Sequence, residues 1–159
     1  KRQITISTVA YDGYPLDVAF EQISGLGLKL VEPAYIKGYM DFSEVDFSDS
    51  AAETMRGKLA AHGLGAIAIS AHMDNGAPDA VAMLERRIRF TAAIGAKFTI
   101  TNATDTARRA DLERCITANL PLAEGLNIVI ALENPGNGPD NLMRDGSSGA
   151  ALVAAFDSP

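Results

Sequence analysis

Short apolar and β-branched runs recur along the chain, separated by longer segments of mixed polarity. Each run is almost continuously apolar rather than alternating, which is typical of strands that are buried on both faces, as in a parallel sheet. The last three runs begin about thirty residues apart, which is the length of one β/α unit. The predicted strands are Ile4–Val9, Leu28–Glu32, Ala66–Ala71, Phe98–Thr101 and Ile128–Leu132.

The segments between these runs have the three- and four-residue spacing of amphipathic helices. The clearest is Asp79–Gly95, whose apolar residues recur at that spacing from Val81 to Ile88 and would form one buried stripe. Glu85 and Arg89 are four residues apart on the other side, where they would form an exposed ion pair.

Four further helices are predicted from their start and stop signals. Ser50 and Glu53 form a capping-box pattern that opens a helix ending near His62, and Pro15 suits the first turn of another. Pro121 is expected to kink or shorten the longest of the four. The four segments are Pro15–Leu26, Ser50–His62, Ala107–Glu124 and Ser148–Phe156.

This order predicts a single domain over residues 1–159 with parallel α/β architecture. No linker divides the chain, although Gly136–Gly149 is expected to be a loop rich in Gly, Asn and Asp. Two architectures remain open. One is an open, doubly wound sheet, and the other is a (β/α)8 TIM barrel, which needs about 250 residues and would be incomplete here, with about five β/α units.

A doubly wound sheet that binds nucleotides would have a glycine-rich turn after its first strand. That position holds Tyr11-Asp12-Gly13-Tyr14-Pro15, which matches neither the dinucleotide fingerprint nor the P-loop. The pair Gly25 and Gly27 ends a predicted helix and enters a strand, so it is in the wrong place for a phosphate loop.

Composition restricts the function further. The chain has 159 residues, of which 47% are hydrophobic and 21% charged, as in a soluble globular protein. Its 14 basic and 20 acidic side chains give a net charge of −6, which argues against nucleic acid as the main partner. No apolar run reaches the ~18–20 residues that span a bilayer. The single Cys115 cannot form an internal disulfide, which favours a cytoplasmic location.

Polar side chains lie at the carboxyl ends of four of the predicted strands. In barrel enzymes the catalytic residues lie at these ends. Glu32 is the last residue of the second strand, His72 follows the third, Asn102 follows the fourth and Glu133 follows the fifth. Loop starts chosen at random need not repeat such a series. We therefore take these four residues as candidates for a functional site.

Each candidate is compatible with chemistry and with a structural role. The Glu133 carboxylate could bind a hard divalent cation or transfer a proton, or it could simply face solvent. The His72 imidazole could bind a metal, hydrogen-bond a hydroxyl, carry protons or satisfy a neighbouring backbone group. Glu32 could hold sugar hydroxyls or orient a base, or be a loop carboxylate, and Asn102 is equally open.

Three of these runs resemble the xylose-isomerase-like TIM barrels. This family contains sugar and sugar-phosphate isomerases and epimerases, inosose dehydratases and, more distantly, endonuclease IV. The similar runs are Gly27–Pro33, Ile69–His72 and Ile130–Asn134, and the segment Gly149–Pro159 resembles the fifth helix of the family.

The resemblance implies an isomerase or epimerase that acts on a sugar or sugar phosphate by an enediolate-type proton transfer. It implies one divalent cation, Mn²⁺, Mg²⁺, Co²⁺ or Zn²⁺, with Glu133 as metal ligand and candidate catalytic acid or base. Glu32, His72 and Asn102 would bind the substrate. The remaining family ligands (Asp, His and Glu) follow the next three strands, so we expect residues 1–159 alone to be inactive.

Two departures from the family pattern keep other functions open. Endonuclease IV has a His where this chain has Asn102, and the net negative charge also argues against a DNA repair enzyme. The ketohexose epimerases have Glu-x-x-Asn-Arg-Phe-Glu where this chain continues from Glu133 as Glu-Asn-Pro-Gly-Asn-Gly. A non-catalytic, sugar-binding or regulatory barrel is the main alternative. The expected partner is a small carbohydrate, without nucleic acid or membrane, and homo-oligomerisation is left open.

Overall fold

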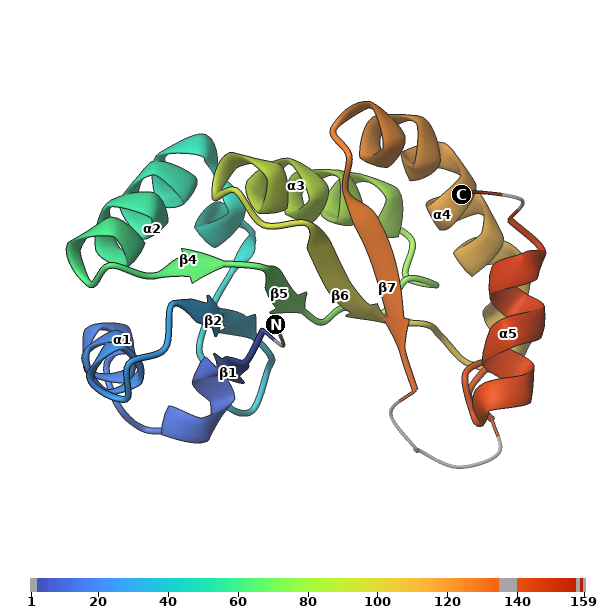
Figure 1. The fold of residues 1–159 in the computed structure, drawn as a ribbon. Helices are drawn as coiled ribbons and strands as arrows, with labels where there is room; N and C mark the ends of the chain where they lie inside the picture. The colour runs from blue at the N-terminus through green and yellow to red at the C-terminus, as the bar shows by residue number, and fades with distance from the viewer. Residues whose placement is uncertain (1–2, 135–139, 157, 159) are drawn as a thin grey trace.

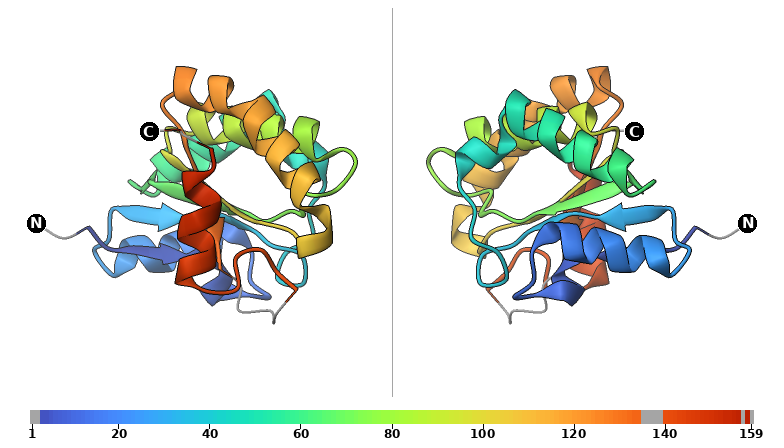
Figure 2. Two further views of the ribbon diagram at one scale, coloured as in Figure 1. Left: turned by 90° about the vertical axis from the view of Figure 1, so that its right-hand side faces the viewer. Right: turned by 90° about the vertical axis from the view of Figure 1, so that its left-hand side faces the viewer.

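The structure is a computed structural model that describes residues 3–134, 140–156 and 158. Parallel strands alternate with helices, and the helices follow one another around the outside of a curved sheet (Figures 1 and 2). The strands are β1 (Thr5–Ser7), β2 (Leu30–Glu32), β3 (Ala34–Tyr35), β4 (Gly65–Ala66), β5 (Ala68–Ala71), β6 (Phe98–Asn102) and β7 (Val129–Glu133). The helices are α1 (Leu16–Gly25), α2 (Asp49–Ala61), α3 (Ala80–Ala93), α4 (Arg109–Gly125) and α5 (Gly146–Ala154), with 3₁₀ turns η1 (Thr8–Tyr11), η2 (Glu44–Phe47) and η3 (Thr106–Arg108).

The seven strand segments form five strands of a barrel. Pro33, which has no N–H for the ladder, separates β2 from β3, and Ile67 separates β4 from β5. The pairing continues across the first break, because the Ser70 N–H donates to the Pro33 carbonyl at 3.0 Å. Each strand therefore lies beside its neighbour in chain order, and all pairs are parallel.

The helix α3 lies between two hydrophobic clusters and contributes to both. Phe90 packs with α1, α2 and the first strands, while Leu84 and Ile88 pack with α4 and α5. The predicted stripe is therefore the buried side of α3, and the exposed pair Glu85 and Arg89 forms at 2.8 Å. Gly95, just beyond the helix, has φ +80°, which suits the left-handed position after a helix end.

The alternation of strands and helices is confirmed, and the differences are local. Val9 belongs to η1 rather than to the first strand. The helix α2 begins two residues earlier than expected, because the Ser48 hydroxyl, not that of Ser50, caps it by accepting from the Ala51 N–H. Pro121 does not shorten α4, which continues to Gly125.

A proline can be accommodated there because the Thr117 carbonyl that loses its helical partner is on the exposed side, where water can bind it. The loop expected over 136–149 falls partly on residues 135–139, which lie outside the described residues. Its last part is helical, since α5 begins at Gly146.

The sheet is open at both sides in the part of the chain that the structure describes. The strand β1 pairs only with β2, and β7 pairs only with β6. A closed eight-stranded barrel would need three more strands between them. This arrangement is that of a partial TIM barrel rather than of a doubly wound sheet, because the strand order follows the chain without reversal.

No helix of the described residues has the length and apolar character needed to cross a membrane.

Candidate functional site

Strand register places three of the four candidate residues in one row. Asn102 is the paired partner of Glu133 at the ends of β6 and β7. Ser70 pairs with Ile100, so His72, two residues later, falls level with Asn102. Paired residues of parallel strands have their side chains on the same face of the sheet. The three polar side chains therefore share the inner face, away from the helices.

The side chains at the two ends of this row are in contact. His72 Nε2 lies 2.7 Å from Glu133 Oε2, although Asn102 lies between their strands. The contact has the distance of an ion pair, but Nε2 has no partner at the angle of a hydrogen bond. The side chain of His72 is 17% exposed and that of Glu133 44% exposed, so the pair is at the boundary between core and solvent.

Two buried atoms of the row have no hydrogen-bond partner. They are His72 Nε2 and Asn102 Oδ1. Most buried polar atoms in proteins are paired, because an unpaired one has lost its water without compensation. Two such atoms from neighbouring strands, beside a carboxylate, indicate a place prepared for a ligand.

A cleft of about 730 Å³ opens beside these residues. His72 and Asn102 line it from the strand ends, and Asp74 from the loop that follows β5. Glu44 of η2 and Arg87 of α3 line the facing wall. The volume is within the range of pockets that hold small metabolites.

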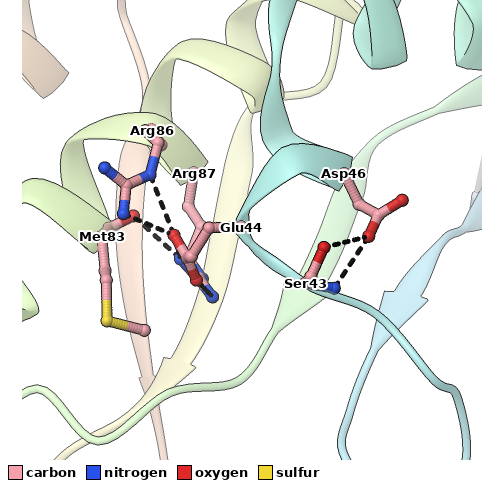
Figure 3. A network of polar contacts seen from close by, with 6 residues as sticks. All are labelled: Ser43, Glu44, Asp46, Met83, Arg86 and Arg87. Atoms are coloured by element: carbon pink, nitrogen blue, oxygen red, sulfur yellow. Dashed lines mark hydrogen bonds and ion pairs between the residues drawn. The ribbon is translucent and has the colours of Figure 1, made fainter.

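The facing wall is an ion-pair network that the sequence analysis missed (Figure 3). Both Arg87 amino groups donate to the Glu44 carboxylate, at 2.8 and 3.0 Å, and Arg86 Nε donates to it at 2.9 Å. Arg87 is 1% exposed, and its guanidinium lies 4.2 Å from the centre of the Phe47 ring. The signal that would have found Arg87 is its position on the apolar stripe of α3, where a charged residue requires a buried partner.

Electrostatics explains why Glu44 stays ionised in this wall. Partial burial alone would raise the pKa of Glu44, but the hydrogen bonds and charges of Arg87 and Arg86 outweigh burial and lower it. The turn that carries Glu44 is held in place by Asp46, whose carboxylate accepts from the Ser43 N–H at 2.8 Å. The network thus joins the long loop before α2 to α3 and fixes that wall of the cleft.

Glu133 is not among the residues that line the cleft, and neither is Glu32, the fourth candidate. The Oε1 atom of Glu32 accepts a hydrogen bond from the Ser70 hydroxyl at 2.7 Å. The structure therefore places Glu32 on the same strand ends but gives it a protein partner. Its expected role in substrate binding stays a prediction.

The donor set can be compared with that of a metal site. Among the described residues, no group of three or more His, Cys, Asp and Glu side chains could hold an ion. His72 Nε2 and Glu133 Oε2 are nevertheless 2.7 Å apart. Two ligand atoms of one cation, each bound at about 2.1 Å and at a right angle, are about 3 Å apart. These residues therefore fit two positions of a coordination sphere, not a whole one.

No protein-family model matches the chain, and no curated protein matches it. Solved structures do. A xylose isomerase-like TIM barrel protein from Mycobacterium smegmatis, in complex with magnesium, is 17% identical with a TM-score of 0.74, and the match covers 98% of this chain and 61% of that one. A D-allulose 3-epimerase from Methylomonas sp., in complex with D-allulose, is 18% identical with a TM-score of 0.73 over 100% of this chain and 60% of that one.

A third structure, the probable 3-DHS dehydratase of Bacillus anthracis, is 14% identical with a TM-score of 0.73, covering 99% of this chain and 60% of that one. The chain thus spans about three fifths of the length of the structures it matches. Identities this low bear on the fold alone. The chain has the fold of the xylose isomerase-like TIM barrels, of which it contains five β/α units.

Proposed function

We propose that this chain is part of a divalent-metal-dependent isomerase or epimerase that acts on a sugar or sugar phosphate. The observation that carries the proposal is the row at the strand ends, where His72 Nε2 and Asn102 Oδ1 are buried without partners beside Glu133. Two structures of the same fold support the substrate class: one is a D-allulose 3-epimerase, and another is an L-ribulose 3-epimerase.

Glu133 and His72 would hold the cation. Their side chains are in direct contact, with Nε2 and Oε2 2.7 Å apart, so both could reach one ion, and a protein of the same fold is described in complex with magnesium. When bound, the cation supplies positive charge that stabilises a substrate oxygen as a neighbouring carbon loses its proton. The remaining ligands would come from the part of the barrel that these residues do not include.

Residues of this chain would also bind the substrate and transfer the proton. Asn102 Oδ1 can accept a hydrogen bond from a sugar hydroxyl, which would give this buried atom its partner. The Glu133 oxygen that is not near His72 is free to take up or return a proton. Ser70 keeps the Glu32 carboxylate in one orientation on the neighbouring strands.

Metal binding tests the proposal without relying on turnover. We expect Mn²⁺ to bind a longer chain that also contains the remaining ligands, measured by calorimetric titration, and Glu133→Gln to weaken that binding by at least about tenfold. Glu113→Gln is the matched control, because Glu113 is an exposed carboxylate on α4 whose partner is Arg109. Equal Mn²⁺ affinity of wild type and Glu133→Gln would refute the assignment of the site.

Turnover is expected only from a complete barrel. We expect a longer chain that contains these residues to isomerise or epimerise a sugar or sugar phosphate, measured over a panel of substrates that includes D-fructose and D-allulose, and residues 1–159 alone to be inactive. Glu133→Gln in the longer chain should abolish the reaction while the protein stays folded. Full activity of that variant would contradict the proposed role of Glu133.

A non-catalytic, sugar-binding barrel is the second candidate. The observation that favours it is the donor set, since the described residues contain no group of three metal ligands. In that case a sugar would bind in the cleft with the same affinity before and after chelation of divalent ions. Sugar binding that requires the ion would instead favour the enzyme.

A further inference from the structure

Asn75 is a fully buried amide in the loop between β5 and α3, three residues after His72. Its Nδ2 atom donates to Thr101 Oγ1 at 3.1 Å and to the backbone carbonyl of Asn102. Its backbone N–H points toward the Ala103 carbonyl at 3.4 Å. The loop that carries His72 is thus attached, through one side chain, to the strand end that carries Asn102.

The side-chain oxygen of Asn75 also has a hydrogen-bond partner. Cys115 of α4 donates to Asn75 Oδ1 at an S···O distance of 3.6 Å. Burial raises the pKa of the Cys115 thiol to about 11, so the thiol keeps the proton that it donates. Donor and acceptor of the Asn75 amide are therefore both satisfied, in contrast to His72 Nε2 and Asn102 Oδ1, which have no hydrogen-bond partner.

The surroundings leave Asn75 little freedom. The next residue, Gly76, lies so close to β6 that a Cβ atom there would be 2.5 Å from Thr104 Oγ1. The preceding residue, Asp74, accepts from the Gly76 N–H at 2.9 Å and is paired with Arg108 at the start of α4. The loop is held on both sides of Asn75, so its position depends on the strand end of β6.

We propose that Asn75 is a positioning residue that sets His72 and Asn102 in register for their ligand. The inference rests on the proposed function, since it concerns the same row of residues. Outer residues that orient ligating side chains commonly change metal affinity when they are removed, although they do not touch the ion. Asn75 would act in this way through the β6 backbone and the loop.

The chain contains a matched control. Asn119 of α4 is also buried, at 2% exposed, and its Nδ2 atom also donates to two groups, the carbonyls of Val81 and Cys115, at 3.1 and 2.9 Å. Asn119 connects α4 to α3 and has no bond to the strand ends. Removing the Asn119 amide costs two hydrogen bonds and removing the Asn75 amide costs three, but only the loss of Asn75 should disturb the row.

The two histidines make the test direct, because a ring-proton NMR spectrum of the full chain contains only two imidazoles. The ring-proton signals of His72 report on the row that His72 forms with Asn102 and Glu133. His62, at the end of α2, is the internal reference, because α2 leads into β4 at the opposite ends of the strands. We expect Asn75→Ala to move the His72 signals and leave those of His62, and Asn119→Ala to leave both in place.

Titration with Mn²⁺ provides the second readout. Asn75→Ala should bind the ion about tenfold more weakly than wild type, whereas Asn119→Ala should bind within about twofold of it. Should Asn75→Ala not fold, Thr101→Val removes one acceptor of the same amide while keeping its volume, and it should move the His72 signals in the same sense. The inference is wrong if the His72 signals stay in place in the folded variant, or if Asn119→Ala moves them equally.

The outcomes separate this inference from the proposed function. A longer wild-type chain that contains the remaining ligands and still binds no Mn²⁺ would refute the metal site, yet the His72 signals of the ion-free protein would show whether Asn75 positions the row. Conversely, a chain that loses its ion with Glu133→Gln but keeps its His72 signals with Asn75→Ala would retain the function and refute the positioning role.

Discussion

Two walls of one cleft contain charged and polar side chains, but the two walls differ in how far these side chains are paired within the protein. In the wall formed by η2 and α3, the Glu44 carboxylate is engaged by both Arg86 and Arg87. In the row at the strand ends, His72 Nε2 and Asn102 Oδ1 are buried without hydrogen-bond partners. In the first wall the Glu44 carboxylate and both Arg87 amino groups are paired and Arg87 Nε alone of these groups is not, whereas in the row neither buried atom has a hydrogen-bond partner.

This difference separates residues whose pairing stabilises the fold from residues that we propose bind a ligand. A buried charge must be paired within the protein, or folding would be strongly disfavoured. A buried neutral polar atom costs less, and a site can tolerate it where a bound ion or substrate supplies the missing partner. The paired wall should therefore respond to mutation through stability, and the unpaired row through binding.

The largest effect is expected from Glu44→Ala. The substitution leaves the Arg87 guanidinium buried without its carboxylate, which should lower the free energy of unfolding by about 3–5 kcal/mol. Urea denaturation would measure the loss. Glu113→Ala is the control, because it removes an exposed helix pair with Arg109 that is worth only about 0.3–0.5 kcal/mol. Equal losses in the two variants would show that the wall is not a structural unit.

A smaller effect of a different kind is expected from Asn102→Asp. The new carboxylate would lie beside Glu133 on the paired strand, so the ion-free protein should lose about 1–2 kcal/mol of stability through repulsion between like charges. Mn²⁺ should reverse the loss, because the variant offers one more anionic oxygen to the ion. Thermal unfolding with and without Mn²⁺ would test this. The same Mn²⁺-induced rise in Tm in variant and wild type would place the ion elsewhere.

The smallest effect on stability is expected from lowering the pH. Because the pKa of Glu44 is lowered in the folded protein, the stability that its ion pairs contribute is present above the ordinary value of 4.5 and is lost as the pH falls below it. Denaturation at a series of pH values should show this loss in wild type. Glu44→Gln should be less stable at neutral pH but lose less on acidification. An unchanged pH profile would mean that Glu44 does not titrate with folding.

Most of the fold could be predicted from the sequence. Continuous apolar runs such as Ile128–Leu132 predicted the buried parallel strands, and the stripe of α3 predicted its buried side. What local patterns missed were the turns whose conformation depends on distant partners. The turn η2 is one of these, since its Glu44 is held by arginines that lie more than forty residues away in the chain.

The candidate site was predicted in part. The strand-end positions of His72, Asn102 and Glu133 follow from where apolar runs stop, and register then makes them neighbours. The bond between Glu32 and Ser70, and the role of Asn75, could not be predicted. Both depend on contacts between strand ends and loops that are separated along the chain by 26 residues or more.

The sequence by itself therefore determined the alternation of elements and the chemical types at the strand ends, because hydrophobic periodicity and strand length are local properties. Only the tertiary structure decided which of these polar groups were to be paired. Hydrogen bonding between side chains depends on register and on loop conformation to within less than an ångström, and spacing along the chain does not specify either. This is why Glu44 is paired with Arg87, whereas His72 Nε2 and Asn102 Oδ1 have no hydrogen-bond partner among the described residues.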